Sequence, residues 1–224
     1  MPHVTFLHTA ELNVGVLGGL MAELAPDIEV RHVLHAEYLE AALRDGEISA
    51  DLTDRVRGSM RQAAADGASV VVCSCSTIGA AGEFEDAAAG AEFLRIDRAM
   101  AERAVAAGSN IGVAACLEST VGPTTALTRQ AAAARGVGAE IRTILIADAW
   151  PKLKSGDTAG YIGDIAAGLN READGLDVVV LAQASMAGAA AMCGGLGIPV
   201  LSSPRLGVEA AIAAYRQNSR SGAA

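Results

Sequence analysis

One segment of this sequence is repeated, without gaps, in the other half of the chain. DGASVVVCSCST at residues 66–77 aligns on DGLDVVVLAQAS at residues 174–185, with a constant offset of 108. HVTFLHTAE at residues 3–11 resembles NIGVAACLE at residues 110–118, with an offset of 107. Because the two matches keep the same order and nearly the same offset, we interpret the chain as two homologous halves.

Short apolar runs alternate with helical patterns in both halves. The valine run at 69–74, for example, follows a helical pattern at 48–67 that ends in a glycine, a residue common just after helices. Such alternation is typical of parallel sheets with helices on both faces. The expected strands are 4–8, 27–33, 69–74, 93–97, 110–116, 140–146, 177–182 and 199–203, and the expected helices are 13–24, 48–67, 98–108, 125–136, 186–195 and 207–217.

The predicted fold class is therefore α/β, with two similar lobes. Each lobe is a parallel sheet flanked by helices, and a pseudo-two-fold axis relates the two. The first lobe is expected to contain residues 1–105 plus 205–224, and the second residues 106–204. Ligands of such sheets bind at the carboxyl ends of the strands. We therefore expect one site between the lobes, lined by the loops that follow the strands.

Charge and hydropathy exclude two classes of partner. The 224 residues carry a formal net charge of -9 and no basic cluster, so a nucleic acid is not expected to bind. Residues 178–204 are uncharged, but Gln183, Pro199 and several glycines and serines interrupt them, which argues against a membrane span.

The four cysteines indicate the cellular compartment. The N-terminus lacks the positively charged start of a signal peptide, and cysteines without a secretory signal are typical of free thiols in a reducing compartment. We therefore expect a cytoplasmic protein with a small-molecule partner. The sequence leaves open whether it forms a homodimer or a higher homo-oligomer.

A cysteine and two hydroxyl residues follow the valine-rich strand of the first lobe. This run, Cys75-Ser76-Thr77, resembles the aspartate/glutamate/hydantoin racemase superfamily, whose members carry a C-(N/S/T)-T motif after a strand in each lobe. Residues 201–211 (LSSPRLGVEAA) and 95–104 (RIDRAMAERA) are also similar to this family. The resemblance covers essentially the whole chain. It implies proton transfer beside a substrate carboxylate, with one cysteine per lobe as acid or base and no cofactor.

Cys75 is the predicted catalytic residue. An α-proton beside a carboxylate is very weakly acidic, and a thiolate in a dry site can remove it if the thiol pKa falls from about 8.5 towards neutrality. Cys73 lies two residues earlier on the strand, so it should share the face of Cys75 and serve packing. A metal site is not indicated because no CxxC or histidine pair lies nearby, and a disulfide across one residue would be strained.

The second lobe departs from the family pattern at the decisive position. The repeat places Gln183 opposite Cys75 and Ser185 opposite Thr77. A carboxamide cannot exchange a proton at neutral pH, which puts the symmetrical two-thiol mechanism in doubt. Cys116 is the remaining candidate for a second thiol, although inert packing is the preferred interpretation for it and for Cys193.

Hydroxyl and amide side chains in the same loops are candidates for holding a substrate carboxylate. Ser119 and Thr120 open a predicted helix, where helix capping is an equally good reading. No glycine-rich dinucleotide loop or phosphate loop is present, so neither a cofactor nor a metal is expected. The predicted substrate-binding residues are Thr9, Asn13, Ser76, Thr77, Ser119, Thr120, Gln183 and Ser185.

Three hypotheses about function follow from the sequence and the resemblance. The first, which we favour, is thiol-based proton transfer at the α-carbon of a small amino acid or related carboxylate, as in a racemase or isomerase. The second is a single-cysteine decarboxylase or lyase acting on a malonate-like diacid. The third is a carboxylate-binding homologue without catalysis.

Overall fold

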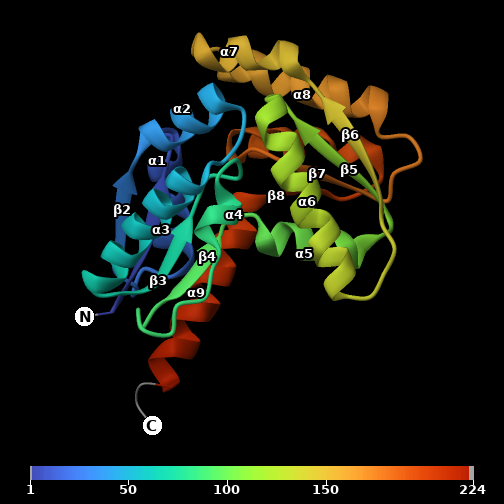
Figure 1. Ribbon diagram of the computed structural model, residues 1–224. Coiled ribbons are helices and arrows are strands. Elements are labelled where there is room, and N and C mark those ends of the chain that lie inside the picture. Colours follow the sequence, from blue (N-terminus) through green and yellow to red (C-terminus); the bar gives the residue numbers. More distant parts are fainter. Residues whose placement is uncertain (1, 222–224) are drawn as a thin grey trace. The chain divides into compact units, whose positions relative to one another are not determined.

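The computed structural model describes residues 2–221, which fold into two compact units (Figure 1). The first unit contains the residues up to Ile96 and those from Pro204 onward, and the second contains Asp97–Ser203. Each unit is a parallel sheet flanked by helices, which is the predicted α/β fold.

Helix α5 (Arg98–Ala107) belongs with the second unit, whereas the sequence placed most of it in the first. Its buried side chains, among them Met100 and Ala104, pack within the second unit, where α5 contacts helix α6 (Glu118–Ala134). The boundary between the units therefore lies before α5. The sequence could not show this, because it does not reveal which elements a helix packs against.

The first unit is built on a four-stranded sheet with the order β2-β1-β3-β4, in which all neighbours are parallel. Helices α1 and α9 pack on the face that carries Phe6 and Val72, and α2, α3 and α4 pack on the face that carries Leu7 and Val71. The strands are β1 (His3–His8), β2 (Val30–Leu34), β3 (Ala68–Cys73) and β4 (Glu92–Arg95), and the helices are α1 (Leu12–Leu24), α2 (Ala36–Asp45), α3 (Ala50–Ala65), α4 (Gly79–Gly82) and α9 (Ser203–Ser221).

The second unit repeats this design with the order β6-β5-β7-β8. One face, which carries Ala114 and Leu181, packs against α8 and the 3-10 helix η2, while α5 and α6 contact the central strands β5 and β7. The strands are β5 (Asn110–Ala115), β6 (Glu140–Leu145), β7 (Val178–Leu181) and β8 (Val200–Ser202), and the remaining helices are η1 (Ala147–Ala149), α7 (Trp150–Lys154), α8 (Thr158–Glu172), η2 (Ala184–Met192) and η3 (Gly194–Leu196).

The two sheets agree in register as well as in order. Val4 pairs with Val70 in the first unit, and Ile111 pairs with Val178 in the second. These are the positions that the two sequence matches align, because their offsets of 107 and 108 carry one pair onto the other. Since a slip of one residue would turn every side chain to the opposite face, the shared register confirms the internal repeat.

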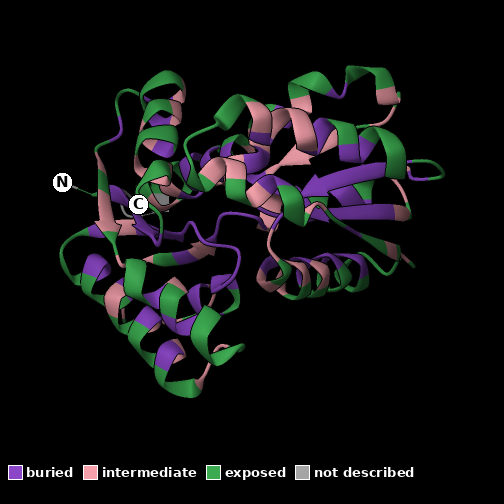
Figure 2. Cartoon of the chain, turned by 90° about the horizontal axis from the view of Figure 1, so that it is seen from above, coloured by how far each residue is buried: buried purple, intermediate pink, exposed green. Residues whose placement is uncertain are grey.

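The central strands are buried along their length. Every residue of β1 and β7 is buried, while the edge strand β6 exposes most of its residues (Figure 2). A strand covered by helices on both faces needs apolar side chains on both, which is why the valine runs lack the alternation of a half-exposed strand.

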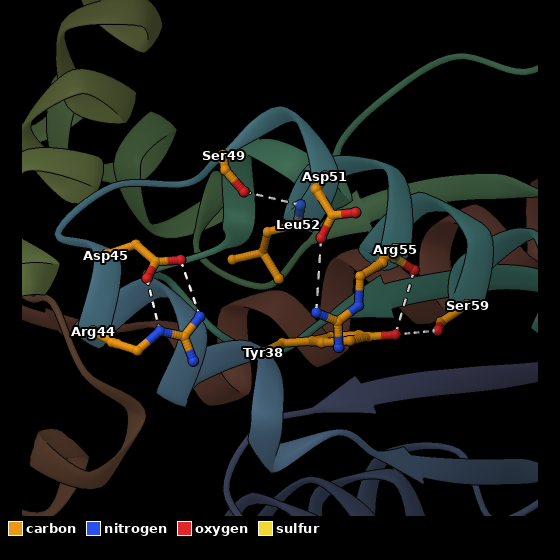
Figure 3. A network of polar contacts seen from close by, with 8 residues as sticks. All are labelled: Tyr38, Arg44, Asp45, Ser49, Asp51, Leu52, Arg55 and Ser59. Carbon is orange, nitrogen blue, oxygen red and sulfur yellow. Dashed lines mark hydrogen bonds and ion pairs between the residues drawn. The ribbon is translucent and has the colours of Figure 1, made fainter.

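The corner between α2 and α3 shows how polar contacts fix the helices of the first unit. The Ser49 hydroxyl accepts a hydrogen bond from the backbone N–H of Leu52 at 3.1 Å and so caps α3. The guanidinium of Arg55 lies over the ring of Tyr38, 5.1 Å from its centroid, and the Tyr38 hydroxyl lies 2.7 Å from that of Ser59 (Figure 3). These contacts join α2 to α3 on the outside of the sheet.

The predicted helix at 186–195 is wrong in type. The segment forms the 3-10 helix η2 and the short η3, and Cys193 lies between them rather than within an α-helix. Glycines lower α-helix propensity, and Gly188 lies close to Ile162, whose Cδ1 would be 2.2 Å from an added Cβ.

Helices α2, α7 and α8 are present although the sequence reading did not assign them. The sequence did contain a start signal for α8, since aspartate is a common helix N-cap residue. In the structure the Asp157 carboxylate caps α8 by accepting a hydrogen bond from Gly160 N at 2.9 Å. Among the residues that the structure describes, no helix is both long enough and apolar enough to cross a membrane.

Candidate active site

The candidate residues of the first unit follow its two central strands. In the order β2-β1-β3-β4 the chain reverses direction across the sheet between β1 and β3, and ligands of open parallel sheets bind at such a point, beyond the carboxyl ends of the strands. Thr9 follows β1, and Cys75, Ser76 and Thr77 follow β3. The structure therefore brings these four to the same edge of one sheet, and Asn13 lies close by in the first turn of α1.

Cys75 is the least buried of the four cysteines, each of which is a free thiol. Its residue is 9% exposed, against 0% for Cys73 and 2% for Cys116 and Cys193. Cys73 and Cys75 belong to the same apolar cluster beside α3, which confirms that the two share one face. Cys73 is fully packed, and Gly82 of α4 lies so close that an added Cβ would be 2.3 Å from Cys73 Cβ.

The turn that carries Cys75 is fixed at both ends by backbone hydrogen bonds. The N–H of Ser74 donates to the carbonyl of Leu7 in β1 at 2.9 Å, and the N–H of Gly79 donates to the carbonyl of Ser76 at 3.3 Å. Ser76 and Thr77 are buried within this turn. A catalytic thiol must be held in a defined position relative to the reacting carbon, and this turn meets that requirement.

Two histidines and Ser74 form a hydrogen-bonded chain beneath this turn. His8 Nδ1 lies 2.8 Å from Ser74 Oγ, and His8 Nε2 lies 2.8 Å from His32 Nδ1. Burial, together with the neighbouring His32, lowers the pKa of His8 to about 4, and burial also lowers the pKa of His32. His8 is therefore neutral at physiological pH. Nothing in the sequence alone indicates that these three residues are in contact.

Gln183 occupies the corresponding place in the second unit, two residues after the end of β7, as Cys75 is after β3. Its carbonyl oxygen Oε1 accepts hydrogen bonds from two backbone N–H groups at the end of β5, those of Cys116 at 2.6 Å and Leu117 at 3.2 Å. Because backbone N–H groups only donate, the oxygen must be the atom that faces them, and the side-chain orientation is settled. The NH2 group is left as the outer end of a side chain that is 8% exposed.

Cys116 lies beside Gln183 and is held as a thiol. Burial raises its pKa to about 11, and its hydrogen bond with the Tyr161 hydroxyl only partly offsets this effect. The Tyr161 hydroxyl also lies 2.9 Å from the Ser185 hydroxyl, and burial raises the pKa of Tyr161 as well. Tyr161 is a member of this group that the sequence analysis missed, since it lies on the unassigned helix α8.

Ser119 and Thr120 lie in the first turn of α6. The Thr120 hydroxyl donates to the Leu117 carbonyl at 2.7 Å, so this proton is used within the helix end. The Ser119 hydroxyl oxygen is buried and has no hydrogen-bond partner among the residues that the structure describes. Of the two, Ser119 therefore has the hydroxyl that is available to a ligand.

Comparison with known proteins identifies the family. The profile of the Asp/Glu/Hydantoin racemase family matches residues 15–211, which is most of the chain. The chain belongs to this family. It is therefore a racemase-like enzyme, as the Cys75-Ser76-Thr77 motif suggested. A search of curated proteins found no match to the sequence.

Solved structures of racemases have the same fold as this family member. The aspartate racemase of Picrophilus torridus is 16% identical, with a TM-score of 0.69 over 96% of this chain and 94% of its own. The glutamate racemase RacE1 of Bacillus anthracis is 12% identical, with a TM-score of 0.68 over 96% and 82%. An unliganded arylmalonate decarboxylase is 16% identical, with a TM-score of 0.53 over 96% and 93%.

Proposed function

We propose that this racemase-family protein transfers a proton at the α-carbon of a small amino acid or related carboxylate, with Cys75 as its only catalytic thiol. The thiolate of Cys75 removes the proton, the resulting thiol exchanges that proton with solvent, and the thiol then delivers a solvent-derived proton to the same face of the carbanion. Family membership supports the reaction class, and the fixed turn around Cys75 supports its role.

The observation that carries the proposal is the way Gln183 is held. A two-base racemase needs an acid on the second face, and the internal repeat assigns that position to Gln183. With Oε1 bound to the N–H groups of Cys116 and Leu117, the free NH2 group can only donate hydrogen bonds. Such a group suits a substrate oxygen that gains negative charge, and it cannot supply a proton to carbon.

The neighbouring thiol is a poor substitute for the missing base. With a pKa of about 11, Cys116 carries very little thiolate at neutral pH, and only the thiolate removes protons from carbon efficiently. Cys116 therefore serves packing and the hydrogen bond to Tyr161. Only one face of the substrate is then provided with a base.

The remaining polar residues are proposed to bind the substrate. A carboxylate is held well by several N–H and O–H donors at once, and the proposal takes from the internal repeat that both strand ends serve one substrate. No cofactor enters this mechanism. The proposed substrate-binding residues are Thr9, Asn13, Ser76, Thr77, Ser119, Thr120, Gln183 and Ser185.

A second candidate reaction is decarboxylation of a malonate-like diacid. The presence of one thiol rather than two favours it, because loss of carbon dioxide generates the carbanion without a base and a single thiol then protonates one face. The same residues would take the same parts, with Cys75 as the acid and the NH2 group of Gln183 beside the remaining carboxylate.

Both reactions are tested by incubation with substrate panels in deuterated water. The panels contain amino acids, hydroxy acids and substituted malonates, and proton NMR follows the α-position. We expect loss of the α-proton signal of one class of acid, or conversion of a malonate into a single deuterated enantiomer. Tight carboxylate binding with no exchange on any panel would contradict the proposal and identify a binding protein without catalysis.

A further inference from the structure

We propose that the chain His32–His8–Ser74 is a positioning device for the catalytic turn, in which His8 sets the orientation of Cys75 by holding the residue before it. The inference rests on the proposed function, since it assigns these residues to the service of the Cys75 thiol. His8 and His32 are positioning residues, because neither hydrogen-bonds to Cys75.

The three residues come from three adjacent strands. His8 ends β1, His32 lies in β2, and Ser74 directly follows β3. The rings of His8 and His32 stack with centroids 5.1 Å apart, and Phe6 stacks on His32 at 5.8 Å. His8 is fully buried, and Ser74 is 3% exposed. The inner end of the chain, His8 with Ser74, is therefore buried, while His32 at its outer end is partly exposed.

Helix α1 closes over the outer end of the chain. Gly18 of α1 approaches His32 so closely that an added Cβ would lie 3.2 Å from His32 Nε2. The absence of a side chain at this point lets the helix lie against the imidazole. His32 is thereby held from two sides, by the helix and by the ring of His8.

Both ring nitrogens of His8 are used in hydrogen bonds. A neutral imidazole has one N–H donor and one acceptor nitrogen, and His8 has a partner at 2.8 Å on each. If Nδ1 donates to Ser74, then Nε2 accepts from His32, and the reverse arrangement is equally complete. Both nitrogens are needed, so only histidine satisfies the two partners at once.

The link from Ser74 to Cys75 follows from strand geometry. Successive side chains of an extended chain point to opposite faces, and Ser74 turns towards His8 while Cys75 packs in the cluster beside α3. Ser74 is held twice, through its N–H to Leu7 and through its hydroxyl to His8. With Ser74 fixed on one face, the direction of the Cys75 side chain on the other face is fixed as well.

The test replaces His8 by asparagine or by glutamine, because the side-chain amide of each can take the place of one ring nitrogen of histidine. Asparagine places its amide near the position of Nδ1 and can keep the bond to Ser74, whereas glutamine reaches the position of Nε2 and keeps only the bond to His32. The folded His8→Asn, His8→Gln and wild-type proteins are treated briefly with iodoacetamide, and mass spectrometry gives the alkylation rate of each cysteine. His35→Gln is the control, since His35 pairs with Glu37 at the surface.

We expect His8→Gln to raise the alkylation rate of Cys75 about fivefold, because the turn loses one anchoring hydrogen bond and opens locally. Cys116 and Cys193 in the other unit keep their rates, and His8→Asn and His35→Gln label as the wild type does. Equal acceleration of all cysteines would show a general loss of stability, and unchanged labelling of Cys75 in both His8 variants would show no link. Either result overturns the inference.

This readout needs no substrate. A protein that fails on every substrate panel but keeps the difference between the asparagine and glutamine variants would lose the proposed function and keep the positioning device. Where exchange activity is found, His8→Gln is expected to lower kcat/KM, since Cys75 and the substrate-binding residues Ser76 and Thr77 lie in the same turn.

Discussion

Replacing Cys75 by alanine is expected to abolish α-proton exchange, with a loss of at least about 10³-fold relative to the wild type. Of the described groups in the proposed site, Cys75 is the one assigned to hold the transferred proton. Gln183 can only donate hydrogen bonds through its NH2 group, and Cys116 remains protonated with a pKa of about 11. The loss is measured by NMR in deuterated water with whichever acid the wild-type protein accepts.

The matched control is Cys193→Ala. Cys193 is buried in the second unit, and burial raises its pKa, so its thiol is inert packing. This variant should keep wild-type exchange, and thermal unfolding should show both variants folded, since removing one buried sulfur costs only about 1–2 kcal/mol. Exchange that survives loss of Cys75 would point to Cys116 or another base.

The free energy of unfolding is expected to fall by up to about 3 kcal/mol through His8 as the pH falls from 6.5 to 4. The pKa of His8 is about 4 in the folded protein and near 6.5 in the unfolded chain. Between these values the unfolded chain binds a proton that the folded protein excludes, so stability is complete above pH 6.5 and is lost as the pH falls towards 4. His32, whose pKa is also lowered, adds a loss of the same sign.

Urea unfolding of the wild type and His8→Gln at a series of pH values measures this effect. The variant has no group to protonate at position 8, so its stability should change less between pH 6.5 and 4. Carboxylates such as Asp177, whose pKa is lowered by backbone N–H groups, lose their contribution at lower pH and do not mask the difference. If the free energy of unfolding changed with pH in the same way for both proteins, His8 would not be held neutral in the folded state.

The fold could be predicted from the sequence because two separate segments repeat in the same order and with nearly the same offset. Strands that match in sequence and in order predict two similar sheets. The structure confirms this, because Val4 pairs with Val70 in one sheet and Ile111 pairs with Val178 at the equivalent positions of the other. Element types were less secure where composition is uniform. In the stretch Ala184–Met192 the small residues give no periodic pattern that would separate an α-helix from the 3-10 helix that forms.

For the candidate site, the sequence indicated mainly residues that lie just after the ends of strands. Cys75 and Gln183 could be found because the repeat aligns them. Tyr161 could not, since it reaches the group from helix α8 through tertiary packing. The contact between His8 and His32 depends on which strands are neighbours and on their register, and neither is written in the local sequence.

The hydrogen-bonded state of Gln183 also lay beyond sequence reasoning. Its identity showed that the second thiol is missing, but the two N–H groups that orient it belong to residues 67 and 66 positions earlier in the chain. Pairing of β5 with β7 brings them together. The structure thus shows that the residue in place of the second thiol, Gln183, is held with its NH2 group pointing away from these two N–H groups.

The stereochemistry of deuterium incorporation tests the one-thiol mechanism most directly. A single enantiomer of an accepted acid is incubated in deuterated water, and chiral chromatography with mass spectrometry gives the deuterium content of each enantiomer at early times. In the proposed mechanism Cys75 serves one face of the substrate and Gln183 the other, so deuterium should appear in the starting enantiomer, with retention of configuration. Early accumulation of deuterium in the inverted enantiomer would contradict the account, because it requires a second group that delivers a proton to the opposite face.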